Sequence, residues 1–367
     1  MNTRENFYIV FRPEKQYVSP AVTQVYIELS SHCNLACRSC VRNSIVDFKK
    51  AHFSPALMRK LLPMLKKLRL QRIVLLGFGE ALCNPHIRTL LSSLRRLDTR
   101  IVLVTNAAFL TDEMSAFLLG LPLDEIFVSW DDDIGGSSAI IRPGIEAADF
   151  RRNIEALSQI KASSGNRQTV LGLEMVATKS NHRFLTDTIG YGRSIGIQSF
   201  IVTNLYPYAE NMSNEILYDT DTRPLVDLRK ILKREIKRND VRVANQKADV
   251  NRRCPFIERG TLFVTARGEI APCPELAYTH PAYYFGYKRM HNSFIAGDTN
   301  RHTLAQAWDN TTFIELREKF RYYDFPNCVY CYRPDMCYKR TVEDTDCYWN
   351  PTPCGECLWA KDIVICP

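Results

Sequence analysis

The stretch "QVYIELSSHCNLACRSCVRN", residues 24–43, decides the fold class because it joins a strand pattern to a metal-binding pattern. Its first seven residues form a short apolar, β-branched run, which is typical of a buried strand. Three cysteines follow at once, Cys33, Cys37 and Cys40, with the spacing C-x3-C-x2-C. Three thiolates are too few to close a four-thiolate zinc site, so a fourth ligand has to come from elsewhere.

Length and charge limit the classes of protein to consider. A chain of 367 residues is too long for one small core, which favours one large α/β unit plus a smaller module. The net charge of +8 is spread over segments such as "MRKLLPMLKKLRLQR", which favours solvated helix faces over a nucleic-acid groove. No apolar run approaches the roughly 20 residues of a membrane span, and no signal-peptide pattern is found. We therefore expect a cytoplasmic protein that binds neither nucleic acid nor membrane.

The thirteen cysteines are unevenly distributed. In a reducing compartment they favour metal binding or redox chemistry over disulfides. Cys83 follows the first three outside their spacing, and we expect it to be a small buried hydrophobic residue. The next cysteine is Cys254, so two cysteine regions are separated by a long stretch without thiols, which suggests two functional modules.

Between these regions, six short apolar runs alternate with amphipathic segments. The runs are "QVYIELS", "RIVLLGF", "RIVLVTN", "EIFVSW", "TVLGLEMVAT" and "SFIVTNLYPY". This alternation predicts parallel βαβ units whose strands are covered on both faces. Polar groups at the C-terminal ends of such strands meet on one rim. The cysteine triplet, "GFGE", "TNA" and "SWDDD" follow the first four runs, which indicates an active site there.

A C-x3-C-x2-C motif after the first strand of six βα repeats resembles the radical S-adenosylmethionine (SAM) enzymes. The resemblance implies a partial (β/α)6 TIM-like barrel in which Cys33, Cys37 and Cys40 hold a catalytic [4Fe–4S] cluster. It implies that S-adenosylmethionine binds the fourth iron and is reductively cleaved to a 5′-deoxyadenosyl radical, which abstracts hydrogen from a substrate. The alternative is a structural zinc knuckle or free buried thiols, which the strand context disfavours.

Two further motifs resemble the cofactor-binding segments of this family. "LLGFGEALCNPHI" resembles its glycine-glycine-glutamate segment, although Phe78 stands where the family often has glycine and Ala81 where proline is usual. This implies that Gly77 and Gly79 let the backbone approach the methionine part, with Glu80 accepting from its ammonium group.

The other motif, "VSWDDD", resembles the ribose-contacting segment, which implies that Ser129 and Asp131 contact sugar hydroxyls. Asn106 stands at the matching end of the third strand. Each such residue alone is more often a turn former, whereas together at successive strand ends they indicate a cofactor site.

The last third of the chain carries a second cysteine pattern. "CVYCYRPDMC", residues 328–337, resembles the SPASM extension, which carries auxiliary [4Fe–4S] clusters, although nine residues rather than three separate its last cysteine from the next one. Nine thiols are one more than two four-cysteine clusters need, so their pairing into one or two clusters stays open. Zinc is the alternative, because C-x2-C pairs are its usual signature. The candidate ligands are Cys254, Cys273, Cys328, Cys331, Cys337, Cys347, Cys354, Cys357 and Cys366.

These patterns predict four parts of the chain. They are an N-terminal extension at 1–22, the radical SAM core at 23–208, a charged bridging segment at 209–253 and a SPASM-like domain at 254–367. The short extension leaves little room for a separate leader-binding domain.

The final segment, "CGECLWAKDIVICP", together with "GFGEALCNP", resembles the radical maturases of tungsten-cofactor aldehyde oxidoreductases. That resemblance implies an oxidoreductase or maturase that modifies a peptide or protein after translation, with ferredoxin or flavodoxin as electron donor. One alternative is a radical dehydrogenase or modifier of a small molecule or cofactor precursor. Another is a non-catalytic zinc or iron–sulfur interaction protein. No residue is identified for hydrogen abstraction or for quenching the product.

Overall fold

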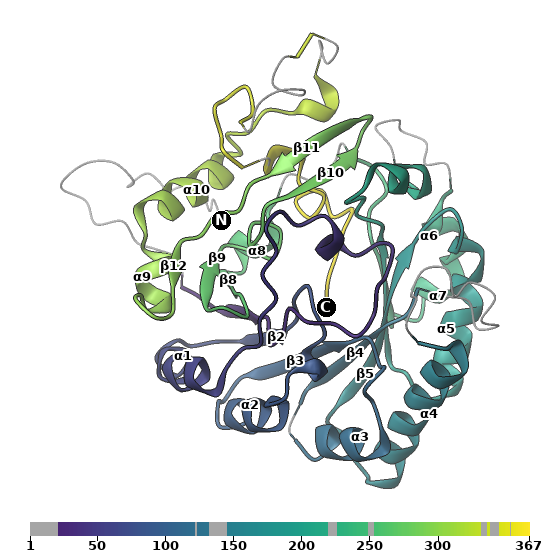
Figure 1. Cartoon of the computed structure of the whole chain (residues 1–367). Coiled ribbons are helices and arrows are strands. Elements are labelled where there is room, and N and C mark those ends of the chain that lie inside the picture. Colours follow the sequence, from purple (N-terminus) through teal and green to yellow (C-terminus); the bar gives the residue numbers. More distant parts are fainter. Residues whose placement is uncertain are drawn as a thin grey trace, which may run out of the picture.

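The computed structural model describes residues 21–121, 123–131, 145–218, 226–248, 253–331, 336–337, 345–352 and 354–367. Ten strands form one curved sheet in the order β12-β9-β8-β1-β2-β3-β4-β5-β6-β7, and β10 and β11 form a separate pair (Figure 1). Most of the predicted N-terminal extension, residues 1–20, lies outside the described residues.

The six predicted βα repeats are confirmed. Strands β1 to β6 pair in sequence order, and every pair is parallel. The strands are β1 Gln24–Ile27, β2 Arg72–Leu75, β3 Arg100–Thr105, β4 Glu125–Ser129, β5 Val170–Ala177 and β6 Ser199–Asn204. The helices between them, α1 Pro55–Lys67, α2 Ile87–Leu94, α3 Asp112–Leu119, α4 Ala147–Ser163 and α5 Leu185–Ser194, lie outside the sheet (Figure 1). This is the predicted partial (β/α)6 barrel.

Local sequence explains where these helices begin. Ser54 accepts a hydrogen bond from the backbone N–H of Leu57, and Pro55 occupies the first turn of α1. Thr111 caps α3 in the same way, by accepting from the N–H of Met114. Such caps satisfy backbone donors that have no partner inside the helix, which favours the starts of α1 and α3 at these positions.

The C-terminal third continues the same sheet. Strand β8, Thr261–Val264, pairs in parallel with β1, and β9, Glu269–Ala271, turns back along β8 through Gly268, whose φ is +91°. Strands β8 and β9 thus form a hairpin around this glycine. The predicted boundary at residue 254 does not coincide with an edge of the sheet, and the predicted bridging segment contributes strand β7, Val241–Val243, beside β6.

The remaining strands, helices and 3-10 turns are as follows. The strands are β10 His280–Tyr284, β11 Tyr287–His291 and β12 Gly297–Asp298, and the helices are α6 Leu228–Ile231, α7 Lys233–Ile236, α8 Pro255–Glu258, α9 Leu304–Trp308 and α10 Thr311–Tyr322. Short 3-10 turns are η2 Val41–Asn43, η3 Ala81–Cys83, η4 His182–Phe184, η5 Glu210–Glu215, η6 Cys328–Tyr330 and η8 Cys354–Glu356. The stretch "HTLAQAWDNTTFIELREKF" forms two helices, α9 and α10, because Asn310 caps α10. No helix in the described ranges is long and apolar enough to cross a membrane.

The last residues of the chain lie inside the curved sheet (Figure 1). Asn204, at the end of β6, donates its side-chain amide to the carbonyl of Ile363 at 2.8 Å. The N–H of Ile365 donates to the hydroxyl of Thr203 at 2.9 Å, and the hydroxyl of Tyr26 on β1 lies 3.5 Å from the carbonyl of Pro367. The tail thus links strands from opposite ends of the βα series.

The buried side chain of Glu28, just after β1, joins the two halves of the molecule. Its carboxylate accepts from the N–H of Phe78 at 2.8 Å, the N–H of Ala266 at 3.0 Å and the hydroxyl of Tyr278 at 2.5 Å. Burial raises the pKa of Glu28, whereas these three donors favour its charged form. One carboxylate therefore fixes the loop after β2 and the β8–β9 turn against the end of β1.

Replacing this acceptor should destabilise the whole protein. In Glu28→Gln the new amide group would face donors, so at least one buried N–H or O–H loses its partner, at a cost of about 1–3 kcal/mol. We expect a lower unfolding temperature in thermal denaturation of the cluster-loaded protein. Glu113→Gln is the control, because Glu113 forms an exposed ion pair with Arg88 and its loss should change the temperature little. An equal effect of the two substitutions would contradict the role of Glu28.

Candidate active site

The three early cysteines lie on the loop between β1 and α1. The Sγ atom of Cys33 accepts from the N–H of Leu35 at 3.4 Å, and the N–H of Cys40 donates to the carbonyl of Cys37 at 3.2 Å. Burial raises the pKa of Cys33, and the nearby thiol of Cys40 adds to the rise. All three thiols are partly exposed. They form a compact set of soft donors that a ligand can reach from the rim of the barrel.

Glu80 ties the motif after β2 to the neighbouring strand ends. Its side chain is 3% exposed, and Oε1 accepts from the N–H of Leu82 at 3.0 Å and the hydroxyl of Thr105 at 2.8 Å. Oε2 accepts from the N–H of Asn106 at 2.7 Å, while the N–H of Glu80 donates to the carbonyl of His32 at 2.8 Å. These bonds fix the carboxylate's orientation beside the cysteine loop. Its predicted contact with a cofactor ammonium stays a prediction.

The two glycines of this motif allow a close approach of neighbouring chain segments. A Cβ atom on Gly79 would lie 2.3 Å from the carbonyl oxygen of Ser30 and 2.5 Å from that of His32. A Cβ atom on Gly77 would lie 2.3 Å from Cγ of Glu28. Such separations are far below normal contact distances, so both positions require glycine for packing against the loop that starts after β1.

Asn106 connects the third strand end to the cysteine loop. Its side-chain amide donates to Oδ1 of Asn34 at 3.0 Å and lies 3.5 Å from Sγ of Cys33. Its own Oδ1 accepts from the N–H of Ala108 at 3.0 Å, which fixes the turn after β3. Asn106 is predictable from its position at a strand end, whereas Asn34, which follows Cys33 directly, has no motif of its own.

Ser129 and Asp131 lie at the end of β4, the strand next to β3. Ser129 is half-buried and is the last residue of its strand, in register with Glu174 of β5. Asp131 is buried, accepts from the N–H of Val176 at 2.9 Å and receives the Asn181 amide on its carbonyl at 2.9 Å. Asp131 therefore holds the ends of β4 and β5 together, and its predicted contact with a ribose remains a prediction.

Cys83 does not lie in the core, so the expectation of a buried residue was wrong. It is partly exposed, and its Sγ lies 3.8 Å from Oδ1 of Asn34. Burial raises the pKa of Cys83 to about 11, and Glu80 and Cys33 add to the rise. Its place three residues after Glu80, in the motif itself, was the signal that it would face the cysteine loop. A polar cavity opens on the other side of Asn34, lined also by Thr111, Glu146, Asp149, Arg152 and Asn153.

Four of the late cysteines surround one buried, largely apolar cavity. Cys254, Cys273, Cys354 and Cys357 line it together. Burial raises the pKa of Cys254 to about 11. Burial also raises the pKa of Cys273, and the thiols of Cys254, Cys357 and Cys354 contribute to that rise. We call these four residues the inner quartet.

A second group consists of Cys328, Cys331, Cys337 and Cys347, which we call the outer quartet. Burial raises the pKa of Cys328 to about 11, and the thiols of Cys347 and Cys337 act in the same direction. The pKa of Cys347 is raised by burial and by the thiols of Cys337 and Cys331 among others. This group is more exposed than the inner quartet.

Cys366 belongs to neither quartet. It lies in the tail inside the barrel, where its Sγ accepts from the indole N–H of Trp359 at 3.2 Å. Burial raises the pKa of Cys366 to about 12. The second largest cause of this rise is the carboxylate of Glu174 on β5 rather than another thiol. The nine late cysteines thus separate into four, four and one, a division that their spacing left open.

Comparison with protein-family models agrees with this geometry. Residues 27–173 match the radical SAM superfamily, and residues 254–332 match the iron–sulfur cluster-binding domain SPASM. The chain carries a radical SAM domain and a SPASM domain. A radical SAM domain implies a [4Fe–4S] cluster and S-adenosylmethionine, and a SPASM domain implies auxiliary iron–sulfur clusters. The family and fold predicted from the sequence are confirmed.

A known protein extends the comparison to nearly the whole chain. The chain is 27% identical over 347 residues to the tungsten-containing aldehyde ferredoxin oxidoreductase cofactor-modifying protein of Pyrococcus furiosus, covering 94% of this chain and 96% of that one. Among solved structures, SuiB of Streptococcus suis bound to S-adenosylmethionine aligns with a TM-score of 0.61 at 15% identity, over 86% of this chain and 72% of that one. Native anSMEcpe with bound AdoMet also gives 0.61, at 14% identity, over 88% and 92%. At such identities the structures show the shared fold alone.

The close packing at Gly79 makes a prediction for the cysteine loop. In Gly79→Ala the new methyl group would push Ser30 and His32 away, which would displace the loop that carries the radical SAM cysteines. We expect lower iron content after reconstitution and a loss of about 1–3 kcal/mol in stability, by iron analysis and thermal unfolding.

Gly190→Ala is the matched control for this substitution. Gly190 lies in α5, and a Cβ atom there meets nothing within 4 Å. Alanine should leave iron content unchanged and stabilise the helix by up to about 1 kcal/mol. Normal iron content in Gly79→Ala would show that the glycine is not needed for the loop.

Proposed function

We propose that this protein is a radical SAM maturase, an oxidoreductase that modifies a peptide or protein. The observation that carries the proposal is the three-thiol loop of the radical SAM domain, held by Glu80 and Asn106 at the rim of a parallel barrel. When bound, the cluster and S-adenosylmethionine supply a carbon radical that abstracts hydrogen from the substrate. The residues of the chain then have to bind, orient and shield these groups.

Cys33, Cys37 and Cys40 are the proposed ligands of the catalytic [4Fe–4S] cluster. Three thiolates match the donor type that such a cluster requires and leave one iron open for a cofactor. The partial exposure of all three supports access for S-adenosylmethionine from the rim. The amide of Asn106, 3.5 Å from Sγ of Cys33, is suited to donate to a thiolate, and such donors tune cluster potential.

The proposed cofactor-binding residues are Gly77, Gly79, Glu80, Asn106, Ser129 and Asp131. Glu80 is supported best, because donors from Thr105 and Asn106 preorient a carboxylate beside the cysteine loop. Ser129 is supported by its half-buried position on the same rim. Asp131 has less support, since its carboxylate already holds β5.

The inner and outer quartets are the proposed sites of two auxiliary [4Fe–4S] clusters. Each offers four thiols, which is the number that full ligation requires. The cavity enclosed by the inner quartet supports this assignment, and its apolar walls would exclude water from a cluster. Cys366 is a predicted ligand that lies apart from both quartets, and we propose that it binds neither of these two clusters.

The substrate, donor and location are proposed from chemistry and from the relatives. A peptide or protein substrate is supported by the maturase relative, and a structure of SuiB bound to its precursor peptide SuiA shares the fold with a TM-score of 0.58. We propose a ferredoxin or flavodoxin as electron donor, because cluster reduction needs a low potential. We also propose the cytoplasm as its location, where thiols stay reduced.

A second candidate is modification of a cofactor rather than of a polypeptide. The Pyrococcus relative is named a cofactor-modifying protein, and this wording favours a small-molecule target. The two candidates differ in what stimulates S-adenosylmethionine cleavage. Stimulation by a cofactor precursor alone supports the second candidate, whereas a requirement for a partner polypeptide supports the first.

The radical assignment is tested by removing the three early thiols. We expect reconstituted wild-type protein with dithionite to cleave S-adenosylmethionine to 5′-deoxyadenosine. A Cys33/Cys37/Cys40→Ala variant should lose about four irons and all cleavage, while the auxiliary iron remains. Iron and sulfide analysis and chromatography of the products measure both effects. A variant that still cleaves the cofactor, or a wild type that binds zinc alone, would refute the assignment.

The division of the late cysteines makes a separate prediction. Cys357→Ala should lose up to about four irons, because it removes one of the four proposed cluster ligands of the inner quartet. Cys366→Ala should keep the wild-type iron content, although it removes one thiol from the same tail. The two variants serve as controls for each other. Iron loss in Cys366→Ala without a fall in the unfolding temperature would show that Cys366 is a cluster ligand and would contradict this division.

A further inference from the structure

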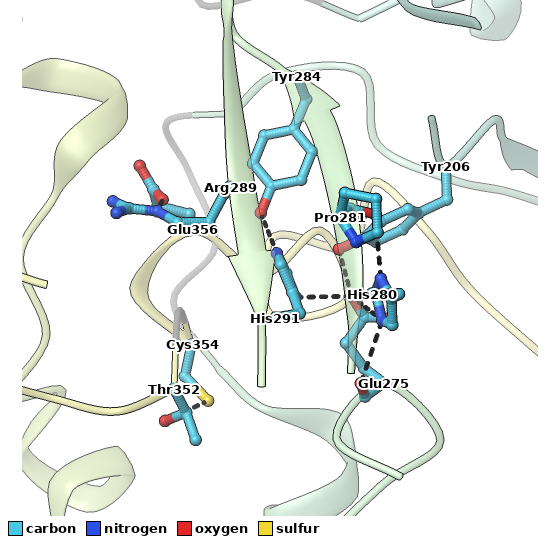
Figure 2. Close-up of polar contacts among 10 residues, drawn as sticks. All are labelled: Tyr206, Glu275, His280, Pro281, Tyr284, Arg289, His291, Thr352, Cys354 and Glu356. Carbon is cyan, nitrogen blue, oxygen red and sulfur yellow. Dashed lines mark hydrogen bonds and ion pairs between the residues drawn. The ribbon is translucent and has the colours of Figure 1, made fainter. Parts of the chain in front are cut away.

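Glu275, His280 and His291 form a buried cluster that neither the radical site nor the two quartets use (Figure 2). Their side chains are 3%, 0% and 1% exposed. The two histidines are direct partners in the antiparallel register of β10 and β11, and their rings stack with centroids 5.2 Å apart. Glu275 reaches them from the segment between β9 and β10.

The polar atoms of this cluster converge on one point. Nδ1 of His291 lies 2.8 Å from Oε1 of Glu275, and Nε2 of His280 lies 3.5 Å from the same oxygen. All three ligand atoms lie within 4.8 Å of one another. Two imidazole nitrogens and a carboxylate oxygen at such separations match the donor set of a mononuclear transition-metal site.

The outer ring nitrogens are already occupied by other partners. Nδ1 of His280 lies 3.1 Å from the carbonyl of Pro281, an acceptor that favours a proton on this nitrogen. Nε2 of His291 lies 3.0 Å from the hydroxyl of Tyr284. Histidines that bind a metal characteristically use their second nitrogen in this way, which fixes the tautomer and the ring orientation.

Two of the inner atoms lack suitable partners among the described residues. Nε2 of His280 faces only acceptors, the carbonyl of Glu275 at 3.3 Å and its carboxylate. Oε2 of Glu275 makes no hydrogen bond to any described residue, whereas Oε1 pairs with Nδ1 of His291 at 2.8 Å. Buried polar atoms without partners are costly, so a positive species between the three side chains would satisfy both atoms at once.

We propose that Glu275, His280 and His291 bind one divalent transition-metal ion of the zinc class, distinct from the iron–sulfur clusters. The hydroxyl of Tyr206 hydrogen-bonds to Glu275 and stands ready to orient it or to complete the shell (Figure 2). Glu275 and His291 also line the cavity of the inner quartet, where an anionic cluster would favour a neighbouring cation.

The rival explanation is a buried ion pair without metal. A second proton on His280 would also satisfy the acceptors that face it, and Glu275 would then neutralise an imidazolium. This alternative predicts no metal at the cluster. The two explanations therefore differ in a quantity that can be measured without any enzymatic assay.

The test uses the full chain with its iron–sulfur clusters loaded, incubated with zinc chloride and desalted. We expect about one zinc per chain by elemental analysis, and zinc-edge X-ray absorption with only nitrogen and oxygen neighbours at about 2.0–2.1 Å. Glu275→Gln and His280→Ala should lose this zinc, whereas His302→Ala, which alters a histidine outside the cluster, should keep it. Zinc that remains in Glu275→Gln, sulfur neighbours at about 2.3 Å, or no bound zinc in the wild type would each overturn the proposal. The absorption spectrum of the wild type decides the matter even if a variant fails to fold.

Discussion

The structure depends on the buried carboxylate of Glu28 and on the strand that ends beside it. Strand β1 has β2 on one side and β8 on the other, although β8 lies more than 230 residues further along the chain. The loop that carries the cysteines starts at Glu28, directly after β1, and Gly77 of the glycine motif packs against the side chain of Glu28. A charge buried this deeply is tolerated because three donors from three segments surround it. The radical SAM loop and the C-terminal module therefore share one support.

Most of the barrel could be predicted because its signals are local. Alternating apolar runs and amphipathic segments define β1 to β6, and short caps such as Thr111 mark where helices begin. The strand-end residues Glu80 and Asn106 meet beside Cys33 because parallel strands bring their C-terminal ends together. Here the order of motifs along the chain maps directly onto the order of strands in the sheet.

The C-terminal third could not be predicted in the same detail, because its arrangement depends on contacts distant in sequence. No local pattern indicates that β8 joins β1, or that Cys254 and Cys357 share a cavity. The spacing of nine thiols allowed many pairings, and only tertiary packing separates Cys366 from the rest. Asp131 shows that a polar residue at a strand end can also bind the neighbouring strand, a role that its position in the sequence did not reveal.

The β10–β11 hairpin explains how the two quartets keep a fixed relation to each other. Arg289 of β11 lies 2.9 Å from the carboxylate of Glu356, within the turn that carries the inner cysteines, and 3.9 Å from Sγ of Cys328 in the outer quartet. Two residues further on, the same strand contributes His291 to the wall of the inner cavity. Since alternate residues of a strand point to one side, Arg289 and His291 act from the same face of the hairpin. A cationic side chain between two groups of thiols offsets the negative charge that clusters would bring, so the hairpin contributes electrostatic as well as mechanical support.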